Sequence, residues 1–214
     1  MAKNFYLQQK QNEVLAIQKI KAEVQLLKSQ IHPRFLFHSL SSIYNDMQNG
    51  SEESPGMLLK LSDLLSYILY ESDERLVPLE KELLFLENYI ELEKASRGTG
   101  LSIETGNVIN TNGKLIAPLL LIPLAEYAFE QCDNNKEQQL SLMVNILEKE
   151  KAFWFIFTIS GYTELVGGSV KDNGQLLEVQ KRLKIIYPEK HEFKIAKDKN
   201  AITIFLSLLL DQTI

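Results

Sequence analysis

The chain has 214 residues, of which 45% are apolar and 24% are charged, a composition typical of a globular protein and not of a disordered one. The formal net charge of −5 makes the chain a poor electrostatic partner for nucleic acid, and we expect no such partner. The single cysteine, Cys132, excludes an internal disulfide and any metal site built from cysteines. Glycine and histidine, both central to phosphate chemistry, are scarce at 10 and 3 residues, so their positions bear directly on whether the chain can handle phosphate.

The first 45 residues contain one proline and no glycine, and they are rich in helix formers. Within them Ile17, Val24 and Ile31 recur every seven residues, and so do Ile20 and Leu27. This spacing predicts the seam of a short coiled coil through which two copies of the chain dimerise. The alternative is a single amphipathic helix that packs on its own core.

Two further helices are expected before residue 100. A loop with glycine and proline at 49–56 precedes an apolar stripe of helical spacing over 57–71, which predicts an antiparallel helical hairpin. Pro78, followed by Glu80 and Glu82, then marks the start of a helix that runs to about Arg97.

From Leu101 onward the pattern becomes mixed. We expect strands or hairpins over 101–105, 140–159 and 192–209, and helices over 117–131 and 175–187. Trp154 and the phenylalanines beside it alternate with strand spacing and are expected in the core of the sheet. The C-terminal part should therefore consist of helices packed on a largely antiparallel sheet.

The stretch from Leu27 to Leu40 resembles the phosphoacceptor segment of bacterial sensor histidine kinases that pair a short His-kinase domain with a GHKL-type ATPase domain and signal to LytTR-type response regulators. The blocks 61–67, 77–82, 89–94, 118–126 and 181–188 resemble the same family in the same order. The resemblance implies an α+β fold. Residues 1–76 would form a coiled-coil entry with a helical dimerisation and phosphoacceptor-like domain, and residues 77–214 would form a GHKL ATPase-like α/β sandwich.

The phosphorylated histidine of that family falls on Arg34 in this sequence. A neutral imidazole is a nucleophile near physiological pH, whereas a guanidinium stays protonated and has no free lone pair. Arg34 therefore cannot accept a phosphoryl group. His38, one helical turn further on, or His32 is the alternative acceptor.

The residues that would bind Mg-ATP are altered as well. Glu126 matches the glutamate of the family's Glu-Asn pair, but Tyr127 stands where the Mg²⁺-binding asparagine would be. Ser160-Gly161 occupies the place of the motif that contacts adenine, and Asn173-Gly174 that of the glycine-rich phosphate motif. Since phosphate cradling needs glycine for a close backbone approach, nucleotide binding is doubtful here and we expect no bound cofactor and no metal.

Together these changes predict a cytoplasmic signalling portion of a two-component sensor histidine kinase-like protein without autophosphorylation activity. The alternative is an active histidine kinase that uses a non-standard acceptor such as His38. By the resemblance, its partners are a second copy of the chain and either a response regulator or a partner kinase. No apolar stretch reaches the roughly 18 residues that span a bilayer, so any membrane attachment is expected through a segment outside this chain, as in an inner-membrane sensor.

Overall fold

The computed structural model describes residues 33–97, 101–108, 110–133, 140–161 and 173–210. The chain divides into two compact units, 1–37 and 38–214, and the second unit contains nearly all of the described elements. The expected dimer seam at residues 17–31 and the alternative acceptor His32 lie outside the described residues.

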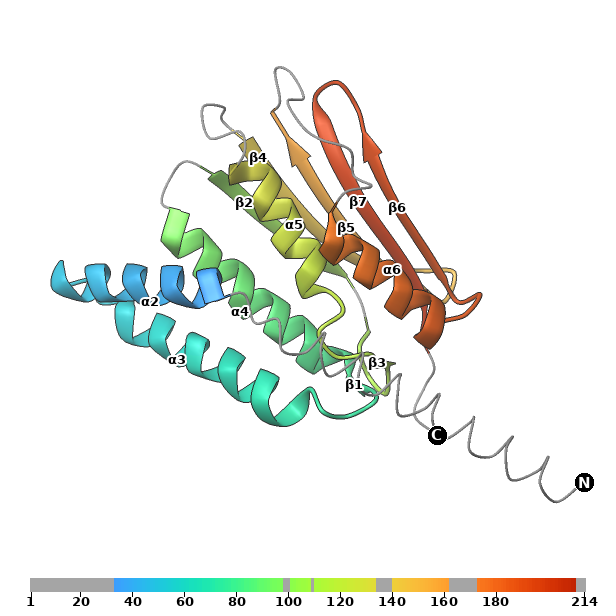
Figure 1. The fold of residues 1–214 in the computed structure, drawn as a ribbon, viewed down its shortest axis with the longest axis horizontal. Helices are drawn as coiled ribbons and strands as arrows, with labels where there is room; N and C mark the ends of the chain where they lie inside the picture. Colours follow the sequence, from blue (N-terminus) through green and yellow to red (C-terminus); the bar gives the residue numbers. More distant parts are fainter. Residues whose placement is uncertain (1–32, 98–100, 109, 134–139, 162–172, 211–214) are drawn as a thin grey trace, which may run out of the picture. The chain divides into compact units, whose positions relative to one another are not determined.

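The first described elements form a helical hairpin. Helix α2 (Pro33–Gln48) turns at Gly50, whose φ of +72° suits glycine and whose N–H donates to the carbonyl of Met47 (3.1 Å). The chain then runs back through α3 (Ser54–Ser66), so the expected antiparallel hairpin is confirmed (Figure 1). Directly after α3 the chain forms one π-helical turn, η1 (Tyr67–Glu71). Its backbone hydrogen bonds span five residues, where those of an α-helix span four.

The strand β1 (Val77–Pro78) leads directly into α4 (Leu79–Arg97), and it pairs with the equally short β3 (Leu115–Ile116). Helix α3 packs against α4, and its residues Leu61 and Leu64 are both 2% exposed. Burial on this scale fixes the hairpin to the first helix of the next segment.

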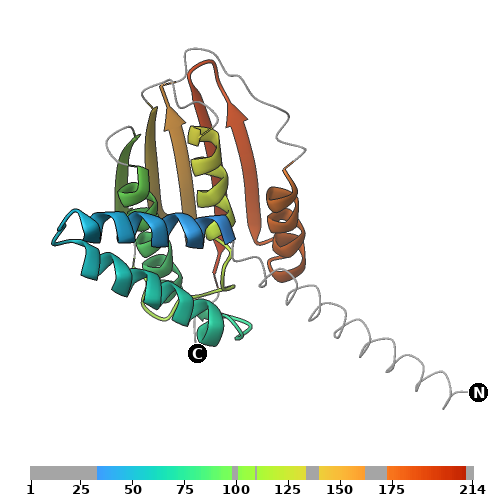
Figure 2. The same cartoon turned by 60° about the vertical axis from the view of Figure 1, so that its left-hand side comes forward.

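The main sheet has five strands in the order β2-β4-β5-β7-β6. Its members are β2 (Leu101–Val108), β4 (Leu140–Lys149), β5 (Ala152–Ser160), β7 (Ala201–Leu209) and β6 (His191–Lys197). Only the pair β2 and β4 is parallel, and the other pairs are antiparallel as expected. Helices α4, α5 (Ile122–Asp133) and α6 (Gly174–Ile186) cover one face of the sheet (Figures 1 and 2).

The core lies between that face and the three helices. Phe153, Phe155 and Phe157 of β5 are fully buried there, and the alternate residues of β4 and β7 flank them. The expectation for Trp154 was wrong, because the two-residue period of the strand turns it to the opposite face. There it contacts the ring of Phe205 edge to face, and the ammonium of Lys149 lies 4.8 Å from its ring centre.

The helix expected over 117–131 begins five residues later, at Ile122. The segment Ala117–Leu121 is a loop, in which Pro118 lacks an N–H and Leu119 adopts a φ of +55°. That conformation is uncommon for a residue with a branched side chain, so the loop is held by contacts from outside it.

Candidate functional site

The acceptor position lies on α2. Arg34 falls in the first turn of this helix, and His38 lies on the same helix with an exposed side chain. Exposure leaves the imidazole of His38 open to solvent, and no described contact places it against a nucleotide-type site.

Helix α5 carries Glu126 and Tyr127, the two residues that stand at the family's Glu-Asn pair. Glu126 accepts a hydrogen bond from Gln175 Nε2 of α6 (3.1 Å). Burial, followed by the nearby carboxylate of Glu93, raises the pKa of Glu126 to about 8, and Glu130 adds to this effect. The carboxyl group of Glu126 therefore takes up a proton close to neutral pH.

The side chain of Tyr127 is only 2% exposed. Burial raises the pKa of its phenol, so the group stays protonated and neutral. A neutral, enclosed phenol does not offer the accessible oxygen ligand that Mg²⁺ requires.

The start of α6 faces the same helix. Asn173 caps α6 by accepting from the N–H of Leu176 (3.2 Å), and its side-chain amide donates to Glu130 Oε2 (3.2 Å). Gly174 has open space where a Cβ would stand, so neither backbone geometry nor packing requires a glycine there. The first turn of α6 is thus paired with carboxylates of α5.

Ser160 and Gly161, expected in the nucleotide-binding region, lie at the end of β5. Gly161 has a φ of +103° and donates its N–H to the carbonyl of Asn200 in the β6–β7 turn (3.3 Å). The structure therefore joins the α5 and α6 residues of the predicted site to each other, whereas it ties Gly161 to a turn of the sheet.

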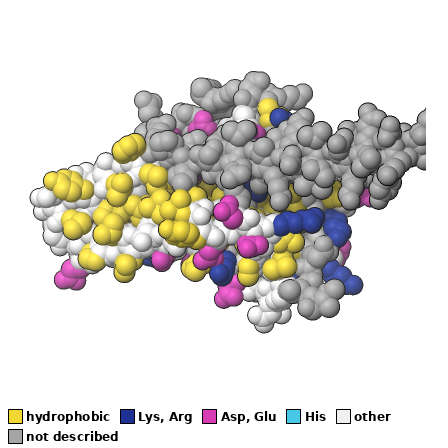
Figure 3. All heavy atoms as spheres, turned by 60° about the horizontal axis from the view of Figure 1, so that its bottom comes forward, with side chains coloured by type: hydrophobic (Ala, Val, Ile, Leu, Met, Phe, Trp, Pro, Cys, Tyr) yellow, Lys and Arg dark blue, Asp and Glu magenta, His cyan; other side chains and the backbone are white. Residues whose placement is uncertain are grey.

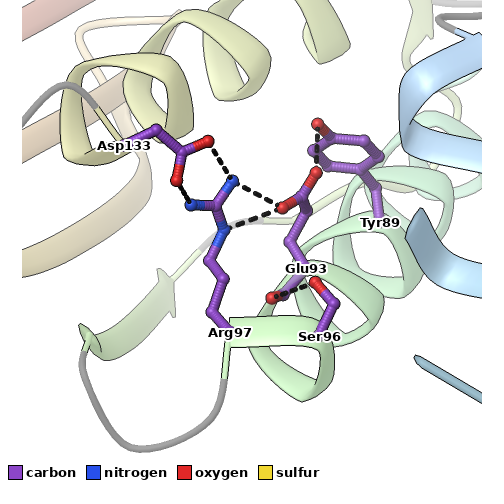
Figure 4. A network of polar contacts seen from close by, with 5 residues as sticks. All are labelled: Tyr89, Glu93, Ser96, Arg97 and Asp133. Carbon is purple, nitrogen blue, oxygen red and sulfur yellow. Dashed lines mark hydrogen bonds and ion pairs between the residues drawn. The ribbon is translucent and has the colours of Figure 1, made fainter. Parts of the chain in front are cut away.

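A partly buried ion-pair network lies beside this site and was not expected from the sequence (Figure 4). Glu93 of α4 accepts from Tyr89 Oη (3.1 Å) and from Arg97 Nε (2.8 Å), and Arg97 also holds Asp133 at the end of α5. The guanidinium further lies 4.9 Å from the ring centre of Phe129. The four-residue spacing of Glu93 and Arg97 was the only available signal in the sequence.

Across the described residues, no three His, Cys, Asp or Glu side chains gather in a way that could hold a metal ion. None of the described helices is long and apolar enough to cross a membrane. Cys132 is buried, as expected for a small hydrophobic side chain, and burial raises the pKa of its thiol to about 12.

Stability should depend on pH through Glu126. Because the folded-state pKa of this group lies above its unfolded value, its contribution is fully present below about pH 4.5 and is lost as pH rises through 8. We expect Glu126→Gln to remove up to about 3 kcal/mol of the fall in unfolding free energy between pH 5 and 8. Urea unfolding of both proteins across this range measures the difference, and parallel pH curves would contradict it.

Within the described residues, three helices cover one face of a five-stranded sheet and a helical hairpin precedes them. The structure is similar to the histidine kinase domain of the blue-light activated histidine kinase EL346 from Erythrobacter litoralis, with a TM-score of 0.50. The match covers 90% of this chain and 96% of that chain at 7% sequence identity.

The sequence points to the same class. The model of the histidine kinase family matches residues 22–101. The chain is 28% identical over 160 residues to the sensor protein LytS of Bacillus cereus, which covers 75% of this chain and 25% of LytS. It is 31% identical over 110 residues to the sensor histidine kinase YpdA of Escherichia coli, which covers 50% of this chain and 19% of YpdA.

These matches agree with the family to which the sequence resemblance pointed, the sensor histidine kinases. It spans about a quarter of the length of LytS and about a fifth of that of YpdA. The expected α+β fold is confirmed, and the histidine kinase domain of EL346 shares it.

Proposed function

We propose that this chain is a signalling module of a two-component sensor that does not phosphorylate itself. The observation that carries the proposal is the pairing of Gln175 with Glu126 and of Asn173 with Glu130. These residues stand where the resemblance places the nucleotide, and their side chains are engaged with one another. The carboxylate of Glu130 in addition opposes the negative charge of a triphosphate.

The buried phenol of Tyr127 supports the same conclusion, because it replaces an amide that could bind Mg²⁺. Arg34 at the acceptor position supports it independently, since a guanidinium is not a nucleophile. A working kinase needs both an acceptor and a nucleotide, and each half of the chemistry lacks its key residue.

Calorimetric titration with Mg-ATP tests the proposal. We expect no binding at up to about 1 mM nucleotide, where a productive kinase would bind in the micromolar range. The variant Tyr127→Asn, alone and combined with Glu130→Lys, restores an amide and removes one carboxylate, and any gain of binding there identifies these two side chains as the obstacle. Micromolar binding by the unaltered chain, with acid-labile phosphate on His38, would establish the active-kinase alternative instead.

The module would act as a homodimer. Exposed apolar side chains gather over α2 and α3 (Figure 3), and they include Leu40, Tyr44, Met47, Leu58 and Leu59. Tyr44 and Leu59 are 62% and 67% exposed, and an apolar surface shared by two adjacent helices is typical of a face that a second copy covers. A pair of such hairpins would bury these side chains in a four-helix arrangement.

A dimeric module without phosphoryl transfer would act through its partners. By its family, these are a response regulator or a partner kinase, to which the chain would pass a conformational state. A cytoplasmic position is part of this proposal, because two-component regulators receive their signal there. Any membrane attachment would come from a segment outside this chain.

A further inference from the structure

The loop Ala117–Leu121, which leads into α5, is held by one buried carboxylate. Glu82 of α4 is 0% exposed, and its two oxygens accept from the backbone N–H groups of Leu119 (3.0 Å), Leu120 (2.9 Å) and Leu121 (3.2 Å). These bonds satisfy three successive donors and keep Leu119 in its left-handed conformation. The carboxylate thus acts as a clamp on the loop from the side of α4.

Helix α6 holds the same loop from another side. The guanidinium of Arg182, 8% exposed, donates to the carbonyls of Pro118 (2.7 Å) and Leu119 (3.0 Å). The hydroxyl of Tyr187 accepts from the N–H of Ala117 (2.7 Å). All four backbone N–H groups of the loop and two of its carbonyls are therefore bound by the side chains of Glu82, Arg182 and Tyr187, so the loop cannot move without breaking buried hydrogen bonds.

The same carboxylate reaches the helical hairpin. Tyr67, the first residue of the π-helical turn η1, donates its hydroxyl to Glu82 Oε2 (2.7 Å), the oxygen that also accepts from Leu119. The Tyr67 ring stacks on Phe85 of α4 with 4.6 Å between centres. The carbonyl of Tyr67 closes the turn by accepting from the N–H of Ser72 (3.0 Å). Tyr67 therefore takes part both in the π-helical turn and in the hydrogen bonds around Glu82.

We propose that Glu82 is a positioning residue that couples the π-helical turn of the hairpin to the loop Ala117–Leu121, so that a change in either is transmitted to the other. Four donors share one carboxylate that is closed off from bulk solvent, so the loss of one bond redistributes the rest. A single π-helical turn is rare and is frequently found at functional sites, which makes this turn a suitable element for such a coupling.

The coupling continues into α5. The N–H groups of Leu124 and Ala125 donate to the carbonyl of Leu121 (3.1 and 3.3 Å), so the first turn of α5 begins on the clamped loop. Glu126 follows directly. A change in the hairpin would thus reach the α5–α6 pairs of the candidate site through Glu82, and this holds whether or not nucleotide binds there.

Amide hydrogen exchange, measured by NMR on the full chain, tests the coupling. Tyr67→Phe removes one hydroxyl and keeps the ring stack on Phe85. We expect it to speed exchange at Leu119, Leu120 and Leu121 about tenfold, the effect of one lost charge-assisted hydrogen bond. The matched control is Tyr89→Phe, which removes the hydrogen bond between Tyr89 and Glu93 on α4, the helix that carries Glu82. It should leave the exchange rates of those three amides unchanged.

If Glu82 couples the turn and the loop, a change in the loop must also affect the turn. A purely local role of Glu82 would not produce this reverse effect. Tyr187→Phe removes the acceptor of the Ala117 N–H, and we expect it to speed exchange of the Ser72 amide in the turn severalfold, more than that of the β5 amides, which report global unfolding. In a Glu82→Gln background the effect of Tyr67→Phe on the loop should largely disappear. The proposal is overturned if Tyr67→Phe affects the loop no more than Tyr89→Phe does, or if Tyr187→Phe leaves Ser72 unchanged.

Discussion

Glu82→Ala should lower the free energy of unfolding by about 3–5 kcal/mol. Removal of the carboxylate leaves three backbone N–H groups and the Tyr67 hydroxyl without their acceptor inside a site that is 0% exposed. Burial raises the pKa of Glu82 and these donated hydrogen bonds lower it, with burial the larger effect.

Urea unfolding followed by circular dichroism measures the loss. Glu87→Ala is the matched control, because Glu87 lies on the same helix with an exposed side chain and should change stability by no more than about 0.5 kcal/mol. Glu82→Gln keeps one acceptor oxygen and should fall between the two. A loss of less than about 1 kcal/mol for Glu82→Ala would mean that the loop finds other partners.

The double variant Tyr44→Lys, Leu59→Lys should convert the proposed dimer into a monomer. Both side chains lie in the exposed apolar face of α2 and α3, and an ammonium buried there without a counter-charge weakens association by at least about a hundredfold. Sedimentation velocity at a series of protein concentrations measures the change.

Met143→Lys provides the control for this experiment. Met143 is 43% exposed on the outer face of the sheet, so the same kind of substitution there should leave the oligomeric state unaltered. A double variant that still sediments as a dimer would place the interface elsewhere, for example on the seam expected at residues 17–31.

The fold could be predicted from local pattern. The aromatic and β-branched run at 153–159 predicted the strand, although Trp154 was wrongly expected on its buried face, and Gly50 and Pro78 marked the ends of helices. The start of α5 could not be predicted in this way. The residues from Ala117 are apolar enough for a helix, and only contacts with Glu82 and Arg182, distant in sequence, hold them as a loop.

The candidate site could likewise be predicted only in part. Only the resemblance to the family located Glu126, Tyr127 and Asn173. The types of the residues at these positions indicate which part of Mg-ATP binding is lost. The partners of these residues depend on how α5 and α6 pack. Neither the bond between Gln175 and Glu126 nor the Arg97–Asp133 pair has a signature in sequence spacing, since 49 and 36 residues separate the members.

The order of strands in the sheet has a consequence for how this chain folds. The strands β4, β5, β7 and β6 are joined as two antiparallel hairpins, with a turn of two residues between β4 and β5 at Glu150 and Lys151. The parallel strand β2 instead pairs Leu101 with Leu140 across the whole of α5. Because closing a long connection costs more chain entropy than closing a hairpin, we expect the β2 edge, and the helix contacts beside it, to assemble last.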